Sequence, residues 1–258
     1  MSHAAYHLQL DPDQVGAYAL LPGDPARVAL IASRLESARE VATNREFTTW
    51  LGMLDGASIT VTSTGIGGPS TAIAVEELCD LGVQTFIRVG TCGAMQQDQR
   101  RGDLVVAHAA VRDEGTTFQY APVGWPAVAD IDITVALRQA AAQRRLRWRV
   151  GAVQSKDSFY GELHPARMPV ADELRERWRA LTRLGVLASE MECAALFTVA
   201  AARGTRAGGV LVVINDATPD HGAVALPEPG ALPLDDVIDV AVDALRRLLA
   251  TALPGHAG

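Results

Sequence analysis

Two short segments of this chain combine glycine with arginine in a way that suits the binding of a small anion. Gly23-Asp-Pro-Ala-Arg27 and Arg88-Val-Gly-Thr-Cys-Gly93 each follow a short apolar run, where a strand is expected to end at a tight turn. Backbone N–H groups at a glycine turn can point at an anion, and a guanidinium binds an oxyanion through two parallel hydrogen bonds. Two such turns in one chain predict a pocket for a small oxyanion, and phosphate is the one we expect.

A pair of carboxylates adds a second kind of chemistry. Glu190 and Glu192 lie two residues apart near the start of an expected helix, so they cannot share one face of it. One of them would favour the helix N-terminus electrostatically, and the other would reach toward a pocket. From the residues alone, two ordinary carboxylates at a helix start are the simpler interpretation.

The elements that must position these residues alternate between strands and helices. Strands are expected over residues 17–21, 58–63, 85–89, 104–107, 151–154 and 209–214, and helices over 26–35, 71–81, 189–203 and 235–250. This alternation predicts an α/β fold with a mainly parallel or mixed sheet covered on both faces. Ligands bind such sheets at the carboxyl ends of strands, which is where both arginine segments fall. Residues 217–235, rich in proline and glycine, are expected to form a mobile loop beside the same crevice.

A glycine-rich stretch, Gly65-Ile-Gly67-Gly68, follows one of these strands but does not match a nucleotide-binding motif. It lacks the third glycine of a dinucleotide fingerprint and the Gly-Lys-Ser/Thr of a phosphate-binding P-loop. A packing turn or a loop on the substrate side is the interpretation that remains.

Size and composition favour one large domain over residues 1–258 and exclude several classes of protein. Apolar residues make up 48% of the 258, enough for a sizeable core, and the net charge of −7 argues against a nucleic-acid binder. No apolar stretch approaches the length of a membrane helix. The three cysteines, Cys79, Cys92 and Cys193, lack metal-ligand spacing and indicate a reducing compartment. We therefore expect a cytoplasmic protein that binds neither nucleic acid nor membrane.

Five segments of the chain resemble the nucleoside phosphorylase family, and within it the uridine phosphorylases. They are Arg45-Glu-Phe-Thr-Thr-Trp50, Ser63-Thr-Gly-Ile-Gly-Gly-Pro-Ser-Thr71, Arg88-Val-Gly-Thr-Cys-Gly-Ala94, Asp157-Ser-Phe-Tyr160 and Ser189-Glu-Met-Glu192. The resemblance runs from about His7 to the final helix. It implies a three-layer αβα fold with a mixed central sheet, assembled as a homohexamer, a trimer of dimers. It also implies a pentosyltransferase that converts uridine and phosphate reversibly to uracil and α-ribose 1-phosphate, with phosphate as co-substrate and no metal or coenzyme required.

The resemblance also implies roles for individual residues. The phosphate site would contain Gly23, Arg27, Arg88 and Thr91, with Arg45 supplied by the neighbouring subunit. The ribose site would contain Met191 and Glu192, with the neighbour's His7 reaching the 5′-hydroxyl. The base site would contain Phe159, Glu162 and Arg167. Glu46, Ile66 and Ser70 match positions that hold a monovalent cation, such as K⁺, at the dimer interface of some uridine phosphorylases. The catalytic set would be Arg88, Glu192 and Arg167, joined by Asp216 if the base is a purine.

The base end departs from the uridine phosphorylase pattern in two places. Glu162 stands where a glutamine is expected, and an ionised carboxylate beside a base that gains negative charge is unfavourable unless it is protonated or paired with Arg167. Asp216 lies near a strand end where hexameric purine nucleoside phosphorylases have a proton donor, although it could equally cap a loop. Phosphorolysis of inosine or guanosine, with Asp216 as the donor, is therefore the alternative within the family.

Two further alternatives change the chemistry. Nucleoside hydrolases such as methylthioadenosine nucleosidase resemble the same family, but they use water and lack the arginine pocket that Arg27, Arg45 and Arg88 would form here. A non-catalytic nucleoside-binding relative is the third alternative, and turnover with phosphate would exclude it.

Overall fold

The structure is a computed structural model that describes residues 5–216 and 232–252. The loop expected over residues 217–235 falls largely on positions 217–231, outside the described residues. Within the described ranges, no helix is long and apolar enough to cross a membrane.

A single ten-stranded sheet organises the described chain. Its strands are β1 (Tyr18–Leu21), β2 (Glu36–Asn44), β3 (Phe47–Leu54), β4 (Ala57–Thr62), β5 (Thr85–Ala94), β6 (Leu104–Asp113), β7 (Ala127–Val128), β8 (Trp148–Lys156), β9 (Ala188–Glu190) and β10 (Arg206–Asn215). The order along the sheet is β10-β6-β8-β9-β5-β1-β4-β3-β2, with β7 paired to β6. Parallel pairs such as β1·β5 and β6·β8 lie beside antiparallel pairs such as β2·β3 and β10·β6, so the predicted mixed sheet is confirmed.

One end of this sheet closes on itself through β5. The first part of β5 pairs with β1, its last residues pair with β9, and β10 runs parallel to it from Thr85 to Gly93. The strands β10, β6, β8, β9 and β5 therefore form a closed ring. This closure brings strand ends that are far apart in sequence to one rim.

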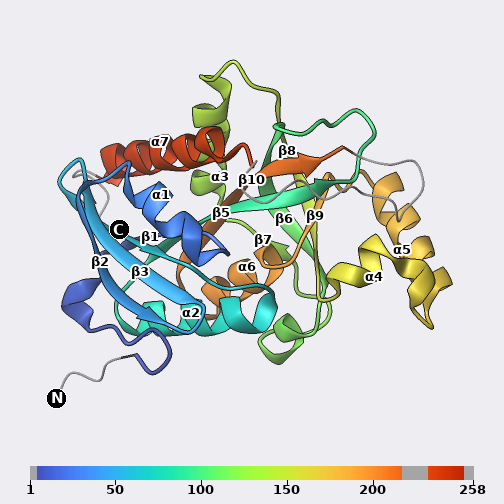
Figure 1. Cartoon of the computed structure of the whole chain (residues 1–258), viewed down its shortest axis with the longest axis horizontal. Helices are drawn as coiled ribbons and strands as arrows, with labels where there is room; N and C mark the ends of the chain where they lie inside the picture. The colour runs from blue at the N-terminus through green and yellow to red at the C-terminus, as the bar shows by residue number, and fades with distance from the viewer. Residues whose placement is uncertain (1–4, 217–231, 253–258) are drawn as a thin grey trace.

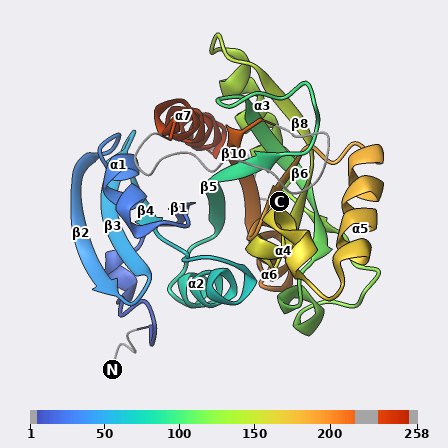
Figure 2. The same cartoon turned by 45° about the vertical axis from the view of Figure 1, so that its right-hand side comes forward.

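Helices cover the two faces of the sheet, as Figures 1 and 2 show. The helices α1 (Val28–Ala32), α3 (Ile131–Ala142) and α7 (Leu234–Ala252) pack on one face, and α2 (Gly68–Asp80) and α6 (Cys193–Ala202) pack on the other. Alternation along the strands supplies both cores: Leu20 faces the α7 side, whereas Ala19 and Leu21 face the α2 side. The fold is thus the three-layer αβα arrangement predicted. The remaining helices, α4 (Phe159–Leu163) and α5 (Ala171–Arg183), lie beyond one end of the sheet.

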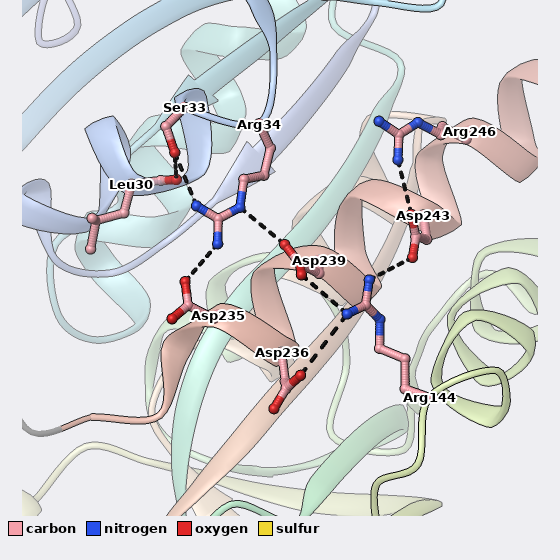
Figure 3. Close-up of polar contacts among 9 residues, drawn as sticks. All are labelled: Leu30, Ser33, Arg34, Arg144, Asp235, Asp236, Asp239, Asp243 and Arg246. Carbon is pink, nitrogen blue, oxygen red and sulfur yellow. Dashed lines mark hydrogen bonds and ion pairs between the residues drawn. The ribbon is translucent and has the colours of Figure 1, made fainter.

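An ion-pair network fixes α7 against the segments that follow α1 and α3 (Figure 3). Arg34 Nε donates to Asp239 Oδ1 (3.0 Å), and Arg144 Nη1 donates to Asp239 Oδ2 (3.1 Å). Arg144 also reaches Asp243 at 2.8 Å, and Arg34 reaches Asp235 at 2.6 Å. The acidic face of α7 is therefore satisfied by arginines from two other parts of the chain.

Two local predictions were wrong in ways that matter for function. The segment 88–93 is not a turn after a strand, because β5 continues to Ala94. Glycine is needed at position 90 for close packing, since a Cβ there would lie 2.7 Å from Leu211 Cδ2. The helix expected over 189–203 begins only at Cys193, because Ser189 pairs with Gly93 and belongs to β9.

Of the remaining elements, some were predicted with different bounds and others were not predicted at all. The segment after β1 does form a turn, in which Asp24 Oδ1 accepts a hydrogen bond from Ala26 N–H (2.9 Å) and caps the short helix η2 (Pro25–Arg27). The antiparallel hairpin of β2 and β3 was not predicted, because its outer strand is largely polar and shows little apolar alternation.

Candidate active site

The carboxyl ends of the strands surround a cavity of about 610 Å³. Its wall comes from seven places: the turn after β1, the turn between β2 and β3, the loop before α2 with the start of that helix, the end of β5, the segment from the end of β8 into α4, the β9–α6 junction and the end of β10. Most of the residues predicted for the site line this one cavity, namely Gly23, Arg27, Glu46, Ile66, Ser70, Arg88, Thr91, Phe159, Glu162, Met191 and Glu192.

Arg88 lies at the centre of the wall, on β5, and is almost completely buried. Its Nε donates to Glu190 Oε2 (3.0 Å) and its Nη2 donates to Glu192 Oε2 (2.5 Å). The third nitrogen, Nη1, is buried and has no hydrogen-bond partner among the described residues. It lies 4.0 Å from the position that a Cβ on Gly23 would occupy, so it faces the turn after β1. A buried cationic N–H without an acceptor is costly, and an anion bound at this point would satisfy it.

Glu190 and Glu192 divide their roles as the sequence predicted. Glu190 accepts hydrogen bonds from the backbone N–H of Glu192 (2.9 Å) and of Cys193 (3.0 Å), so it caps the start of α6. Glu192 reaches into the cavity wall, where its Oε1 accepts from the N–H of Gly67 (2.6 Å). Both carboxylates also hold Arg88, which fixes the guanidinium from two sides.

Burial and charge act against each other in this cluster. Burial raises the pKa of Glu192, and Arg88 opposes that effect only in part. Burial alone would lower the pKa of Arg88, but Glu192 and Glu190 outweigh it and raise that pKa above its usual value. Burial also lowers the pKa of Arg27, with partial compensation by Asp24. Both arginines remain protonated near neutral pH, because the guanidinium is the most basic of the ionisable side chains.

Arg45 and His7, which were predicted to serve the site from a neighbouring subunit, lie outside the cavity wall of their own chain. Arg45 occupies the turn between β2 and β3 with a φ of 55°, and its side chain is exposed. The Nδ1 atom of His7 lies 2.6 Å from Glu77 Oε1, which leaves Nε2 without a partner among the described residues. Neither residue lines the cavity of its own chain.

The three residues predicted for a cation site lie together at one side of the cavity. Ser70 Oγ donates to Glu46 Oε1 (2.8 Å) and lies 2.5 Å from the carbonyl oxygen of Thr64. Ile66 follows on the same loop, with its side chain 77% exposed. This part of the wall therefore offers oxygen atoms next to an exposed apolar residue.

The part of the cavity wall that contains Phe159 and Glu162 also includes residues to which the sequence analysis gave no role. Lys156, Ser189 and Asn215 line the cavity beside Phe159 and Glu162. Lys156 Nζ lies 2.6 Å from Glu162 Oε2, so Lys156 takes the place that the sequence analysis gave to Arg167. Lys156 is the only lysine in the chain, and this was the signal that could have drawn attention to it.

Arg167 and Asp216 do not line the cavity. Arg167 ends the short helix η4 (Pro165–Arg167), is exposed, and has no ion pair in the part of the chain that the structure describes. Asp216 Oδ1 accepts a hydrogen bond from Arg101 N–H (2.8 Å), so its side chain caps the backbone of the segment between β5 and β6.

Comparison with known proteins identifies this arrangement. Residues 17–254 match the family model described as the phosphorylase superfamily. The chain belongs to the phosphorylase superfamily. Among curated relatives, a uridine phosphorylase of Treponema pallidum is 46% identical over 249 residues, which cover 96% of each chain. A uridine phosphorylase of Escherichia coli is 40% identical over 254 residues, which cover 95% of this chain and 98% of the relative. A guanosine phosphorylase of Halorubrum lacusprofundi is 40% identical over 247 residues, which cover 96% of this chain and 95% of the relative.

Membership of the phosphorylase superfamily agrees with the polarity of the cavity. Its lining combines the cationic Arg27 and Arg88 with the acidic Glu162 and Glu192 and the aromatic Phe159. Glu192 is ion-paired to Arg88. Side chains of these types are the ones that an oxyanion, a sugar hydroxyl and a flat ring would contact.

Proposed function

We propose that this chain is a pentosyltransferase that catalyses the reversible phosphorolysis of uridine to uracil and α-ribose 1-phosphate. The observation that carries the proposal is the buried Arg88 with its free Nη1 facing the Gly23 turn, in a chain similar over nearly its whole length to uridine phosphorylases. The site offers a fixed positive charge for phosphate next to a carboxylate suited to a ribose.

The reaction follows from that geometry. A phosphate oxygen held by Arg88, Arg27 and Thr91 forms a bond to C1′ of the ribose, while the bond from C1′ to the base breaks and its electron pair leaves with the base. Positive charge builds on the sugar ring, and Glu192 stabilises it while accepting hydrogen bonds from the 2′- and 3′-hydroxyls. Because phosphate arrives as an anion, the protein supplies positioning and electrostatics and needs no metal or coenzyme.

Guanosine is the second candidate substrate. A guanosine phosphorylase is among the curated relatives at 40% identity, and Glu162 supplies a carboxylate that could accept the ring N–H of guanine. In this alternative the proton donor to the purine is not assigned to Asp216, because that side chain caps the Arg101 backbone.

A neighbouring subunit completes the site in this proposal. Arg45 is exposed and His7 is half-buried, and neither lines the cavity of its own chain. Both can therefore contact the cavity of another chain. A homohexamer built as a trimer of dimers fits this arrangement. In the same interface, Glu46, Ile66 and Ser70 are proposed to hold a monovalent cation such as K⁺. The three cysteines are free, and a reducing cytoplasm is the proposed location.

The first test is base release from uridine, guanosine and inosine, each with and without phosphate. We expect uracil release that requires phosphate. Arg88→Met should lower kcat/KM for uridine by about 100-fold or more, because it removes a positioned charge donor. Arg203→Met, which removes an arginine that pairs with Glu76 and Asp80 on the outside of α2, is the control and should leave turnover unchanged. Release that proceeds without phosphate, or from none of the three nucleosides, would reject the proposal.

A further inference from the structure

We propose that Lys156 is a positioning residue for the base: together with Ser189 it occupies one oxygen of Glu162, so that this carboxylate presents a single acceptor and no net charge to the base. The inference rests on the proposed phosphorolysis of a nucleoside. It assigns a role to a lysine outside the expected site and explains how a glutamate serves where a glutamine is expected.

The three side chains form a compact buried cluster. Lys156 is the last residue of β8, Ser189 lies on β9, and Glu162 lies on α4. Lys156 Nζ lies 2.6 Å from Glu162 Oε2 and donates to Ser189 Oγ at 2.7 Å. Ser189 Oγ in turn donates to the same Glu162 Oε2 at 2.5 Å. Lys156 and Glu162 expose only 11% and 13% of their side chains, so water screens the pair weakly.

Both contacts fall on one oxygen of the carboxylate. A carboxylate oxygen has two lone pairs, and the ammonium and the hydroxyl use both lone pairs of Oε2. Oε1 has no hydrogen-bond partner in the described part of the chain, and it lies 3.6 Å from the position of a Cβ on Gly93. Asn215 Oδ1 lies 3.4 Å from that same position. Oε1 therefore faces the cavity beside an amide, where the edge of a base can approach.

A single free acceptor suits uracil better than guanine. The pairing edge of uracil has one ring N–H between two carbonyl oxygens, so a second free carboxylate oxygen would face a carbonyl and repel it. Guanine instead presents two donors in a row, the ring N–H and the amino group, which match two free carboxylate oxygens. Occupation of Oε2 by Lys156 and Ser189 therefore favours the base with one donor.

The positive charge of Lys156 also serves the chemical step. The base leaves with the electron pair of its bond to C1′, and an unpaired carboxylate next to it would oppose that change. The ammonium beside Oε2 cancels the charge of Glu162 at the base end.

The test is a double-mutant cycle with Lys156→Met, Glu162→Gln and the combined variant, measured as kcat/KM for uridine and for guanosine. Lys156→Met should lower the uridine value by about 10- to 100-fold, since close charged pairs couple by such factors. Glu162→Gln should retain or raise it, because an amide oxygen is a single neutral acceptor. The combined variant should fall within about tenfold of Glu162→Gln alone. Lys156→Met should also lower the ratio of uridine to guanosine turnover, which a merely structural lysine would not change.

Two measurements keep the outcomes distinct. Stabilisation of each variant by phosphate, read as a rise in Tm, shows that the anion end is intact. Ser189→Ala is the second variant, needed if Lys156→Met does not fold. It frees a lone pair of Oε2 without removing the charge of Lys156, and it should also lower the ratio of uridine to guanosine turnover. The inference would be overturned if the effects of Lys156→Met and Glu162→Gln on kcat/KM for uridine simply multiply in the combined variant. It would also be overturned if the ratio of uridine to guanosine turnover is unchanged in both Lys156→Met and Ser189→Ala. A wild-type chain that cleaves neither nucleoside would reject the proposed function before any variant is compared.

Discussion

At the scale of single residues, the site depends on two carboxylates that share one arginine. Glu190 accepts hydrogen bonds from two backbone N–H groups at the start of α6, whereas Glu192 accepts one from the N–H of Gly67 and one from Arg88 and lines the cavity. Arg88 has one nitrogen left for a ligand. Glu192 is therefore the carboxylate whose protonation state we expect to change with pH, and the stability of the fold reports that change.

The raised pKa of Glu192 predicts a pH-dependent stability. Its folded pKa lies above the ordinary value of 4.5 because of burial, so the folded chain binds this proton more tightly than the unfolded chain. The contribution of Glu192 to the free energy of unfolding is then greatest below 4.5 and is lost as pH rises through the raised folded pKa. Glu192→Gln, which resembles the protonated acid, should gain in stability relative to wild type over that window.

Urea unfolding of wild type and Glu192→Gln across that pH range, without phosphate, measures this difference. A difference that stays constant with pH would contradict the prediction. The variant should lose nucleoside turnover at every pH, because an amide supplies no negative charge to the sugar ring.

At the scale of elements, α7 is held by charge as well as by its apolar face. Arg144, in the segment after α3, bridges Asp239 and Asp243, which lie one turn apart on α7 (Figure 3). Arg246 lies on α7 itself, pairs with Asp243 three residues away at 2.9 Å, and reaches Asp55 only at 3.9 Å. The first arginine makes two close ion pairs between elements, whereas the close ion pair of the second lies within α7.

Arg144→Met should therefore destabilise the fold more than Arg246→Met. We expect a loss of about 1 kcal/mol for Arg144→Met, at the upper end for a partly exposed pair, and less for Arg246→Met. Urea unfolding at low salt and in about 1 M salt separates charge from packing, because that salt screens partly exposed pairs. Equal losses for the two variants, or a loss for Arg144→Met that salt does not reduce, would show that packing of the side chain dominates.

At the scale of the whole molecule, the cavity of one chain carries more acidic than basic side chains. Three basic and five acidic side chains line it, which disfavours a phosphate anion. Arg45 is exposed at the tip of the β2–β3 hairpin and does not line the cavity of its own chain. An additional arginine from a neighbouring subunit would offset the excess of carboxylates.

This proposal predicts complementation between inactive chains. Arg88→Met and Arg45→Met should each be nearly inactive alone. Co-expressed, they form mixed dimers in which one site has Arg88 from one chain and Arg45 from the other. With random pairing through a two-fold interface, about one quarter of all sites should be intact.

Turnover of separately purified, mixed and co-expressed samples at equal protein concentration provides the measurement. No gain on co-expression, with mixed assemblies verified by two affinity tags, would show that each chain uses its own Arg45. Co-expression of Arg88→Met with Arg203→Met is the control. Arg203 lies outside the site, so the Arg203→Met chain should be active without any partner.

The order of residues along the chain was enough to predict the alternation of strands and helices, the mixed sheet, and most of the residues that surround Arg88 in the cavity. These features depend on local patterns: apolar runs, glycine beside arginine, and two glutamates that cannot share a helix face. Asp24 caps the turn after β1 because its side chain reaches a backbone N–H two residues away. Such contacts span a few residues, and the order of residues along the chain is enough to predict them.

The cluster around Glu162 depends instead on contacts between segments that are far apart in sequence. Lys156, Glu162 and Ser189 meet because β9 pairs with both β8 and β5, and this pairing also turns the expected start of a helix into a strand. Closure of the sheet through β10 and β5 brings Asn215 beside Gly93. The choice of Lys156 over Arg167 as the partner of Glu162 follows from which side chain lies at the cavity, and no spacing along the chain encodes it. Contacts between strands far apart in sequence depend on the energy of the whole packed sheet, and they become visible only once that sheet is formed.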